Sequence, residues 1–285
     1  VISIGMTVVM ITGGIDISVG SFVAMGCMML AWMMEQAGIG AVPAVLIVLA
    51  TGVVFGLVQG FLVAYMDIQP FIVTLAGMFF ARGMTAIISK DMISISNEMF
   101  MGWAKMKIYF PFGGHVNRKG EMIYPYVYPT VVIALLLLAG AFIMLKYTKF
   151  GRSIYAVGGN QVSATLMGLN VKKTKLLTYT LCSLLTSIGG ICYCLNTMCG
   201  TTTQATGLEM DAISSSVIGG TLLTGGVGNV LGSLVGVLIN GTISTLVKSN
   251  GKLVSSWANI ITAILLCFFI LLQAIFAKVK ESKKA

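Results

Sequence analysis

The chain has 285 residues, of which 57% are hydrophobic and 9% are charged, with a formal net charge of +9 at pH 7 and a mean hydropathy of +0.95. So few charged residues cannot cover a water-facing surface, which excludes a soluble globular protein and predicts an all-α, polytopic bundle in the lipid bilayer. The basic residues gather at the ends of apolar segments, as membrane topology requires, so nucleic acid is not expected as a partner.

Several apolar segments are long enough to span a membrane. A helix needs about 20 apolar residues to cross the roughly 30 Å hydrocarbon core. Eight segments reach or approach this length, at residues 18–34, 42–65, 70–89, 125–146, 176–198, 210–224, 229–248 and 256–277. We predict a helix in each of them, within a single transmembrane domain over residues 1–285.

The chain opens at Val1 with a short apolar segment, VISIGMTVVMI, which leads into the glycine-rich stretch TGGIDISVGS at residues 12–21. We expect the chain to begin inside a helix. A cleaved signal peptide is the alternative, but neither a basic region nor a small-residue cleavage pattern precedes Thr12. Asp16 is expected to accept hydrogen bonds from the exposed N–H groups of this break, and ion coupling is its alternative role.

Four polar residues inside the predicted spans are candidates for a transport pathway: Gln59, Arg82, Asn196 and Asn240. Arg82 could line a pathway or extend to the outer interface from the last turns of its helix. Hydrogen bonding between helices would explain the other three as well as contact with a substrate would.

A second glycine-rich break, within residues 210–233, repeats the first. Thr12, Gly13, Gly14, Gly20 and Ser21 recur as Thr224, Gly225, Gly226, Gly232 and Ser233, each displaced by 212 residues. Irregular backbone persists at membrane depth only where protein or a water-filled cavity satisfies its polar groups. The breaks therefore indicate a pathway, whose candidates are Gly13, Gly14, Asp16, Gly20, Gly225, Gly226, Gly228 and Gly232.

The loop charges predict the orientation. Lysine and arginine residues are concentrated at 147–175 and in the tail at 278–285, so both segments are expected in the cytoplasm, which puts the C-terminus there as well. Residues 90–124 then form an extracytoplasmic loop. Both glycine breaks fall on the cytoplasmic side, which indicates a parallel repeat and not an inverted one. One further helix upstream would give about ten spans in the full protein, the first of them missing or truncated here.

The sequence offers little that could support catalysis or metal binding. It has neither a P-loop nor a recognisable nucleophile and base pair, so an enzyme and a bound nucleotide are not expected. Its six cysteines include no CxxC pair, and the single histidine, His115, is distant from most of them, so no metal site is predicted.

The loop at 147–175 contains a short helical pattern. Val162, Leu166 and Leu169 have helical spacing, with Ala164 and Gly168 as small contact residues. This pattern predicts a helix from about residue 161 to 169 that docks into a groove of a partner. An interfacial helix lying on lipid is the alternative.

Four stretches carry a resemblance to a known family: TGGIDISVGS at 12–21, PFIVTLAGMFFARG at 70–83, FGRSIYAVGGNQVSATLMGLNV at 150–171 and LEMDAISSSVIGGTLLTGGVGNVLGSLVG at 208–236. The chain resembles the permease subunits of sugar ABC importers over essentially its whole length. This group includes the ribose, xylose, galactose and galactofuranose systems. The second and fourth stretches are most similar to galactofuranose-type permeases.

The resemblance implies a multi-pass subunit in the bacterial inner (cytoplasmic) membrane that translocates a monosaccharide. Its partners would be a second permease, identical or related, cytoplasmic ABC ATPase subunits that carry ATP and magnesium, and an extracytoplasmic sugar-binding protein. The residues that match the family's coupling segment to the ATPase are Gly158, Gly159, Asn160, Ala164, Leu166, Met167, Gly168 and Leu169. Family members often have acidic residues after the Gly-Gly-Asn, whereas this chain has Gln161 and Val162.

A self-sufficient secondary carrier for a small polar solute is the alternative function. It would use Asp16 or Arg82 for coupling, because carriers place ionisable groups at membrane depth.

Overall fold

The computed structural model describes residues 1–109, 115–116, 122–249 and 256–282. Helices in this part of the chain are α1 (Ile2–Ile11), α2 (Val19–Glu35), α3 (Ala41–Tyr65), α4 (Pro70–Ile88), α5 (Glu98–Lys105), α6 (Pro129–Tyr147), α7 (Lys149–Gly159), α8 (Gln161–Leu166), α9 (Val171–Thr197), α10 (Leu208–Ile218), α11 (Val230–Ser249) and α12 (Ser256–Ser282). Short antiparallel pairs join β1 (Ile93–Ser94) with β6 (Cys199–Gly200), β2 (Ile108–Tyr109) with β5 (Tyr126–Val127), and β3 (His115–Val116) with β4 (Met122–Ile123).

The structure confirms a polytopic helical membrane protein. Within the described residues, α3, α4, α6, α9 and α11 are long and apolar enough to cross a bilayer, and α1, α2 and α12 contain shorter apolar stretches. Proline occupies the first turn of α4 and of α6, where its missing N–H costs no helical hydrogen bond. Asparagine side chains cap the starts of α5, α8 and α9.

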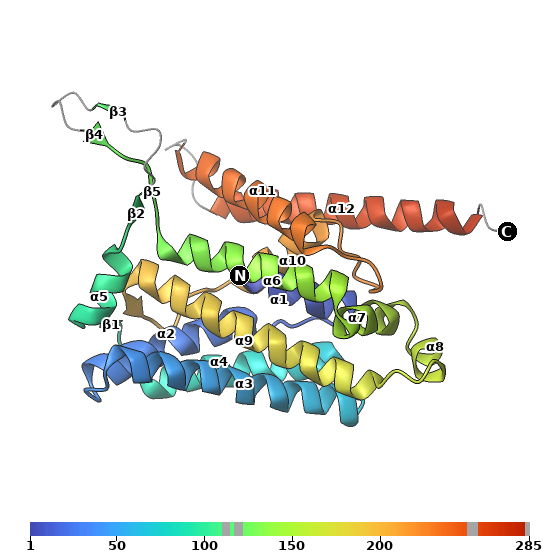
Figure 1. Cartoon of the computed structure of the whole chain (residues 1–285), viewed down its shortest axis with the longest axis horizontal. Coiled ribbons are helices and arrows are strands. Elements are labelled where there is room, and N and C mark those ends of the chain that lie inside the picture. The colour runs from blue at the N-terminus through green and yellow to red at the C-terminus, as the bar shows by residue number, and fades with distance from the viewer. Residues whose placement is uncertain (110–114, 117–121, 250–255, 283–285) are drawn as a thin grey trace.

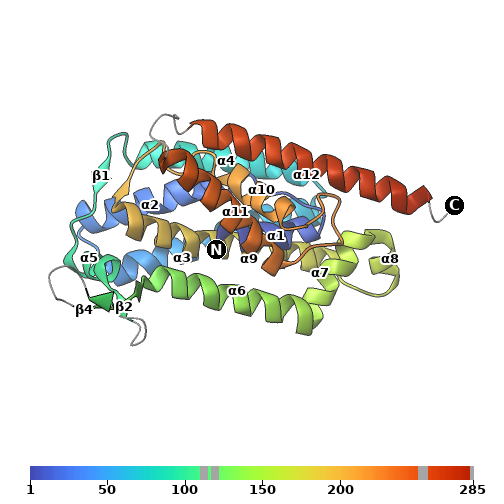
Figure 2. The ribbon, with the colours of Figure 1, turned by 90° about the horizontal axis from the view of Figure 1, so that it is seen from above.

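The long helices lie side by side, with their connections at two ends (Figure 1). One end carries α7 and α8, and we call it the α8 end. The opposite end carries β1, β6 and α5, and we call it the β1 end. Seen from above, α6 and α12 lie along opposite edges of the bundle (Figure 2). Both glycine breaks lie at the α8 end, which agrees with a parallel repeat.

Two predicted boundaries were wrong, and the side of the membrane on which the tail lies stays a prediction. The span predicted from residue 125 begins as a helix only at Pro129, because Tyr126 and Val127 pair with β2. The span predicted over 210–224 is the half-length helix α10, which ends at Ile218 before Gly219 and Gly220. The tail predicted from residue 278 continues α12 as far as Ser282, and residues 283–285 lie outside the described part of the chain.

The loop predicted over 90–124 is folded where it is described; residues 110–114 and 117–121 lie outside that part. The Glu35 carboxylate at the end of α2 accepts hydrogen bonds from the backbone N–H groups of Ser96 and Asn97, at 2.7 and 3.1 Å. This contact, together with the pairing of β1 with β6, holds the segment against the β1 end of α2.

Close contact between α3 and α9 forms the middle of the bundle. Gly52, Gly56 and Gly60 follow one face of α3 at four-residue spacing and lie against α9. A β-carbon on Gly56 would lie 2.8 Å from the Thr180 Cα, and one on Gly60 would lie 2.8 Å from the Leu176 carbonyl oxygen. Small residues at this spacing allow helix backbones to approach closely in a membrane.

Candidate functional site

The site is built around two half-length helices that lie together inside the bundle. From Gly5 to its last residue α1 is buried, and it packs against α9, α10 and α11. Thr7 of α1 shares hydrogen bonds with the hydroxyl groups of Ser216 on α10, at 3.0 Å, and Ser233 on α11, at 2.6 Å. These hydroxyls join α1, which leads into the first break, to α10 and α11, which flank the second.

The two breaks contact each other directly. The Gly226 N–H donates a hydrogen bond of 2.8 Å to the carbonyl oxygen of Ile11, the last residue of α1. A β-carbon on Gly225 would lie 2.7 Å from the Gly13 nitrogen. Gly225 and Gly226 both have left-handed backbone, with φ of +85° and +77°, which side chains other than hydrogen rarely allow. The repeated glycines are therefore needed both for this turn and for the close approach.

The end of α7 completes this contact. A β-carbon on Gly158 would lie 2.6 Å from the Gly226 nitrogen, and one on Gly226 would lie 2.9 Å from the Gly159 Cα. We call Gly13, Gly158, Gly159, Gly225 and Gly226 the glycine junction. Sequence analysis placed Gly158 and Gly159 in a coupling segment and the others in a pathway, and the structure brings the two sets together.

A tyrosine that the sequence analysis did not single out also fixes α7 to the second break. The Tyr155 hydroxyl donates a hydrogen bond of 2.8 Å to the Gly228 carbonyl oxygen. Burial raises the pKa of Tyr155, so its hydroxyl keeps the proton that this bond requires. Ile154 and Val157 of the same helix are buried against the bundle. Movement of α7 would therefore be transmitted to the second break.

The remaining repeated glycines lie at helix crossings. Gly232, in the first turn of α11, packs on the backbone of Gly219 at the end of α10. A β-carbon on Gly232 would lie 3.0 Å from the Gly219 carbonyl carbon. Gly20, in the first turn of α2, lies against the Glu209 carboxylate and the Ala205 carbonyl oxygen. Gly14 lies against Tyr179 of α9.

Asp16 holds the first break. Its Oδ1 accepts hydrogen bonds from the Ser18 N–H, at 3.0 Å, and from the Ser18 hydroxyl, at 2.6 Å. Gln59 of α3 donates to the same hydroxyl at 3.0 Å. The bond from the Ser18 N–H is of the kind expected for Asp16, and the bond from Gln59 links the turn to α3. Ion coupling through Asp16 stays a prediction.

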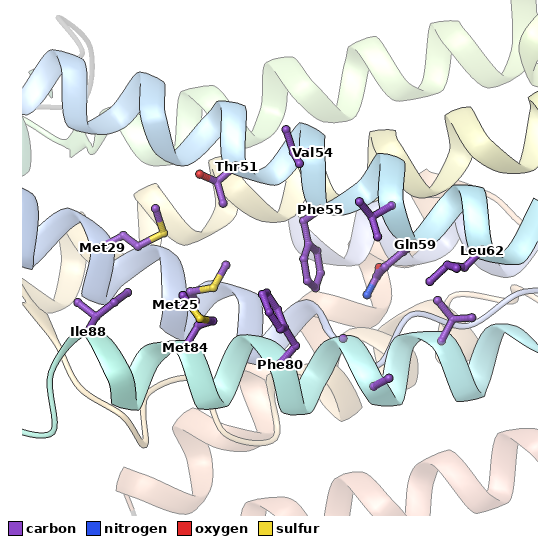
Figure 3. A pocket seen from close by; sticks show the side chains of 14 residues that line it. Met25, Met29, Thr51, Val54, Phe55, Gln59, Leu62, Phe80, Met84 and Ile88 are labelled. Carbon is purple, nitrogen blue, oxygen red and sulfur yellow. The ribbon is translucent and has the colours of Figure 1, made fainter.

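Gln59 also borders a pocket of about 540 Å³ that lies between α2, α3 and α4 (Figure 3). Its walls are apolar side chains such as Met25, Phe55 and Phe80, and Thr51 is the other polar side chain labelled there. Hydrogen bonds to a sugar need several polar groups, so this pocket is poorly suited to a sugar.

A smaller and more polar pocket of about 230 Å³ lies between α1, α10 and α11. Asp211, Ser215, Asn240 and Ser244 are among the residues that line it. The Asn240 amide donates to the Ser215 hydroxyl at 2.9 Å, and Asn240 Oδ1 is buried without a partner in the described structure. Among the four polar candidates, Asn240 therefore has the surroundings closest to those of a polar pathway.

Arg82 and Asn196 lie away from the glycine junction. The Arg82 guanidinium donates to the carbonyl oxygens of Thr202 and Gln204, at 2.9 and 2.8 Å, and so holds the segment that leads from β6 to α10. Asn196 is exposed in the last turn of α9. A pathway role for either residue stays a prediction.

Gln273 of α12 was missed in the sequence, although it is a polar residue in an otherwise apolar segment. Its side-chain amide lies 3.3 Å from the carbonyl oxygens of both Val217 and Thr221, at the end of α10. The last carbonyls of a helix have no partner within that helix. Gln273 therefore adds hydrogen bonds at the end of the half-length helix, where the Val217 carbonyl oxygen also accepts from the Gly220 N–H at 2.9 Å.

The helix predicted over 161–169 is shorter than expected. It ends at Leu166, because Gly168 has a left-handed φ of +78° and reverses the chain before Leu169. Ala164 is buried within the chain itself, so its predicted contact with a partner stays a prediction, whereas Val162, Leu166 and Met167 are 70%, 83% and 67% exposed. These three side chains form an apolar surface, which we call the α8 tip.

Metal-binding clusters of three or more His, Cys, Asp or Glu residues are absent from the described residues.

Comparison with known proteins gives relatives along nearly the whole chain. The family described as "Branched-chain amino acid transport system / permease component" matches residues 1–270. The inner membrane ABC transporter permease protein YjfF of Escherichia coli K12 is 39% identical over 96% of this chain and 79% of its own length. The fructose import permease protein FruG of Bifidobacterium longum is 35% identical, covering 100% of this chain and 82% of its own.

The ribose import permease protein RbsC of Escherichia coli K12 is 37% identical over 86% of this chain and 72% of its own length. No solved structure gives a significant match.

Proposed function

Since this chain belongs to the family of permease components described for branched-chain amino acid transport systems, we propose that it is the membrane-spanning permease of an ABC importer for a monosaccharide. The names of its relatives support sugar as the substrate, since they include ribose and fructose import permeases. We propose a ribose-type or galactofuranose-type sugar. ATP and magnesium would bind to separate ATPase subunits, and this chain would bind no cofactor.

The glycine junction is the observation that carries this proposal. An ATP-driven permease needs a mechanical link between the surface that meets the ATPase and the helices that form the pathway. Here α7 connects the α8 tip to the point where both breaks meet, through Gly158, Gly159 and the bond from Tyr155 to Gly228. A displacement of α8 would be transmitted through the short helix α7 to both half-length helices, α1 and α10.

The α8 tip is suited to docking. Its exposed apolar side chains sit on a six-residue helix that Asn160 caps, with the Asn160 side chain accepting from the Ser163 N–H at 2.9 Å. The Lys175 ammonium donates to the Gln161 side chain at 3.0 Å and fixes the helix to α9. A rigid apolar helix of this kind fits a groove of a partner. In this proposal the partner is the ATPase, so the α8 end and the end of α12 face the cytoplasm.

The remaining partners follow from the same proposal. A second permease, identical or related, would complete the pathway, and a sugar-binding protein would dock at the β1 end. Sugar selection would rest mainly with that protein, so the permease needs only a weakly polar route. The pocket that contains Asp211, Ser215 and Asn240 fits this requirement, because carboxylate, hydroxyl and amide groups can exchange hydrogen bonds with sugar hydroxyls.

The test is recovery of the ATPase with the full-length permease from membranes. Leu166→Glu places a charge on the α8 tip, and we expect it to reduce ATPase recovery at least tenfold, because burying an unpaired carboxylate is costly. Leu166→Met keeps the apolar surface and is the matched control. Gly168→Arg is a poorer choice, since a side chain there also strains the left-handed turn. Equal recovery with the Glu and Met variants would contradict docking through α8.

A self-sufficient carrier is the second candidate, favoured by one observation. Asp16 is buried, and its Oδ2 has no hydrogen-bond partner within the described structure. Uptake by the purified permease in vesicles, without ATPase or binding protein, would favour the carrier and contradict the importer.

A further inference from the structure

A cationic pocket of about 410 Å³ lies at the α8 end, between α6, α7 and the start of α11. Lys146, in the last turn of α6, and Arg152, on α7, line it together with the uncharged residues Phe142, Leu145 and Asn229. The residues described around this pocket include no carboxylate. The coupling proposed above needs neither of the two cations, so their placement calls for another explanation.

The two cationic residues reach this pocket from different helices, Lys146 from α6 and Arg152 from α7. The Lys146 ammonium lies 5.4 Å from the centre of the Phe142 ring, and Arg152 Nη1 lies 3.5 Å from the Tyr147 carbonyl oxygen, so both side chains stay close to the end of α6. The first residues of α11 form the third wall, where Asn229 accepts from the Leu231 N–H at 3.0 Å. The positive end of a 20-residue helix adds to the attraction for an anion.

The position of α6 indicates where such an anion would come from. This helix lies along an edge of the bundle (Figure 2), and apolar side chains such as Leu136 and Ile143 on its outer face are 67% and 54% exposed, as expected for contact with lipid. Lys146 follows where this apolar surface ends, which is the level of the lipid headgroups. Phe142 and Leu145 lie one turn or less toward the hydrocarbon core, next to where an acyl chain would begin.

We propose that this pocket binds the phosphate group of an anionic phospholipid. Basic pockets between transmembrane helices on the cytoplasmic side are suited to such headgroups. Tyr155 and Gly228, whose hydrogen bond joins α7 to the second break, also line the pocket. A bound lipid therefore braces the joint between α7 and the second break. Lipid binding at this pocket requires that the chain lies in a membrane but not that an ATPase docks. The lipid proposal can therefore fail while the importer proposal holds, and the reverse is also possible.

The experiment is a lipid titration of the full-length permease purified from membranes in a neutral detergent, with thermal stability and native mass spectrometry as readouts. Phosphatidylglycerol is compared with phosphatidylcholine and with inorganic phosphate. The double variant Lys146→Gln/Arg152→Gln removes both cations. Lys172→Gln/Lys173→Gln removes two cations elsewhere at the α8 end and is the matched control, and Lys146→Arg/Arg152→Lys keeps the charge.

We expect phosphatidylglycerol, but not phosphatidylcholine, to stabilise the wild type, the control and the charge-preserving variant. The neutral double variant should bind it about 30-fold more weakly, since each basic residue near an anionic lipid contributes roughly a fivefold factor. An equal response to phosphatidylcholine, or unchanged binding by the neutral variant, would overturn the proposal. A response to inorganic phosphate as strong as that to the lipid would overturn the lipid source and indicate a soluble anion.

Discussion

Gly226 donates a backbone hydrogen bond of 2.8 Å to Ile11, across 215 residues of chain, so the second break is bonded to the last residue of the first half-length helix. The two copies of the repeat are therefore one mechanical unit at the α8 end. Gly158 of α7 lies against both the Ile11 carbonyl oxygen and the Gly226 nitrogen, the acceptor and the donor of this bond. Any movement that α7 makes relative to α1 must change the contact between the copies.

Gly158→Ala tests this unit. Its β-carbon would overlap the Ile11 carbonyl oxygen and lie 2.6 Å from the Gly226 nitrogen, and backbone atoms cannot rotate away as side chains can. We expect a loss of about 1–3 kcal/mol in stability, the usual cost of overpacking. ATP-driven uptake in vesicles that contain the whole complex should fall more than the amount of assembled complex does.

Gly102→Ala in α5, outside the glycine junction, is the control for that variant. The β-carbon of an alanine at this position would have no neighbour within 4 Å among the described residues. It should therefore leave melting temperature and uptake close to those of wild type. If both variants behave alike, the contact of Gly158 with the two breaks is not what couples α7 to transport.

The sequence predicts the helices well because each span is a long apolar run, which is a local signal. It also locates both glycine breaks, because the repeat preserves their spacing. It does not predict that Gly158 contacts Ile11 and Gly226, because the residues of α7 alone do not indicate which distant backbone they will meet. The role of Gln273 is not predicted for the same reason. Its hydrogen bonds go to carbonyl groups at the end of α10, which lie near it only in the folded bundle.

The length of α8 was mispredicted for a different reason. The apolar spacing of Val162, Leu166 and Leu169 suggests a helix, but the left-handed conformation of Gly168 ends it first. The segment 90–124 is predicted as a loop, and the strands described within it are only two residues long. The segment of β1 is held by α2 and by β6, which lies about 100 residues further along the chain, and local hydrophobic periodicity does not reveal such contacts.

The glycines of α3 give a second prediction, on stability alone. Gly56→Ala would place a β-carbon 2.8 Å from the Thr180 Cα of α9, so the two helices must separate. We expect a destabilisation of about 1–3 kcal/mol, seen as a lower melting temperature in detergent. Gly140→Ala in α6 is the control, because its β-carbon would have no near neighbour in the described chain and alanine favours a helix by roughly 0.5–1 kcal/mol. A similar loss in both variants would contradict tight α3–α9 packing.

Gln273→Leu tests the support that α12 gives to α10. The leucine leaves the carbonyl oxygens of Val217 and Thr221 without their bonds from α12, each of which contributes about 0.6 kcal/mol in a membrane protein. We therefore expect a destabilisation of about 1 kcal/mol and faster hydrogen exchange at the end of α10. Leu271→Ala, at an exposed position of the same helix, should not change exchange in α10. Unchanged exchange in Gln273→Leu would mean that the carbonyls find other partners.

Asp16→Asn separates the importer from the carrier. The amide oxygen can still accept from the Ser18 N–H, so the turn should survive with a loss of about 1 kcal/mol, the difference between a charged and a neutral acceptor. Asp16→Ala removes the acceptor and should cost more, about 1–3 kcal/mol. In the importer, ATP-driven uptake by the Asn variant should follow the amount of folded complex and stay independent of proton and sodium gradients. If wild-type uptake instead requires such a gradient, and the Asn variant loses that dependence at normal stability, Asp16 couples an ion and the carrier is favoured.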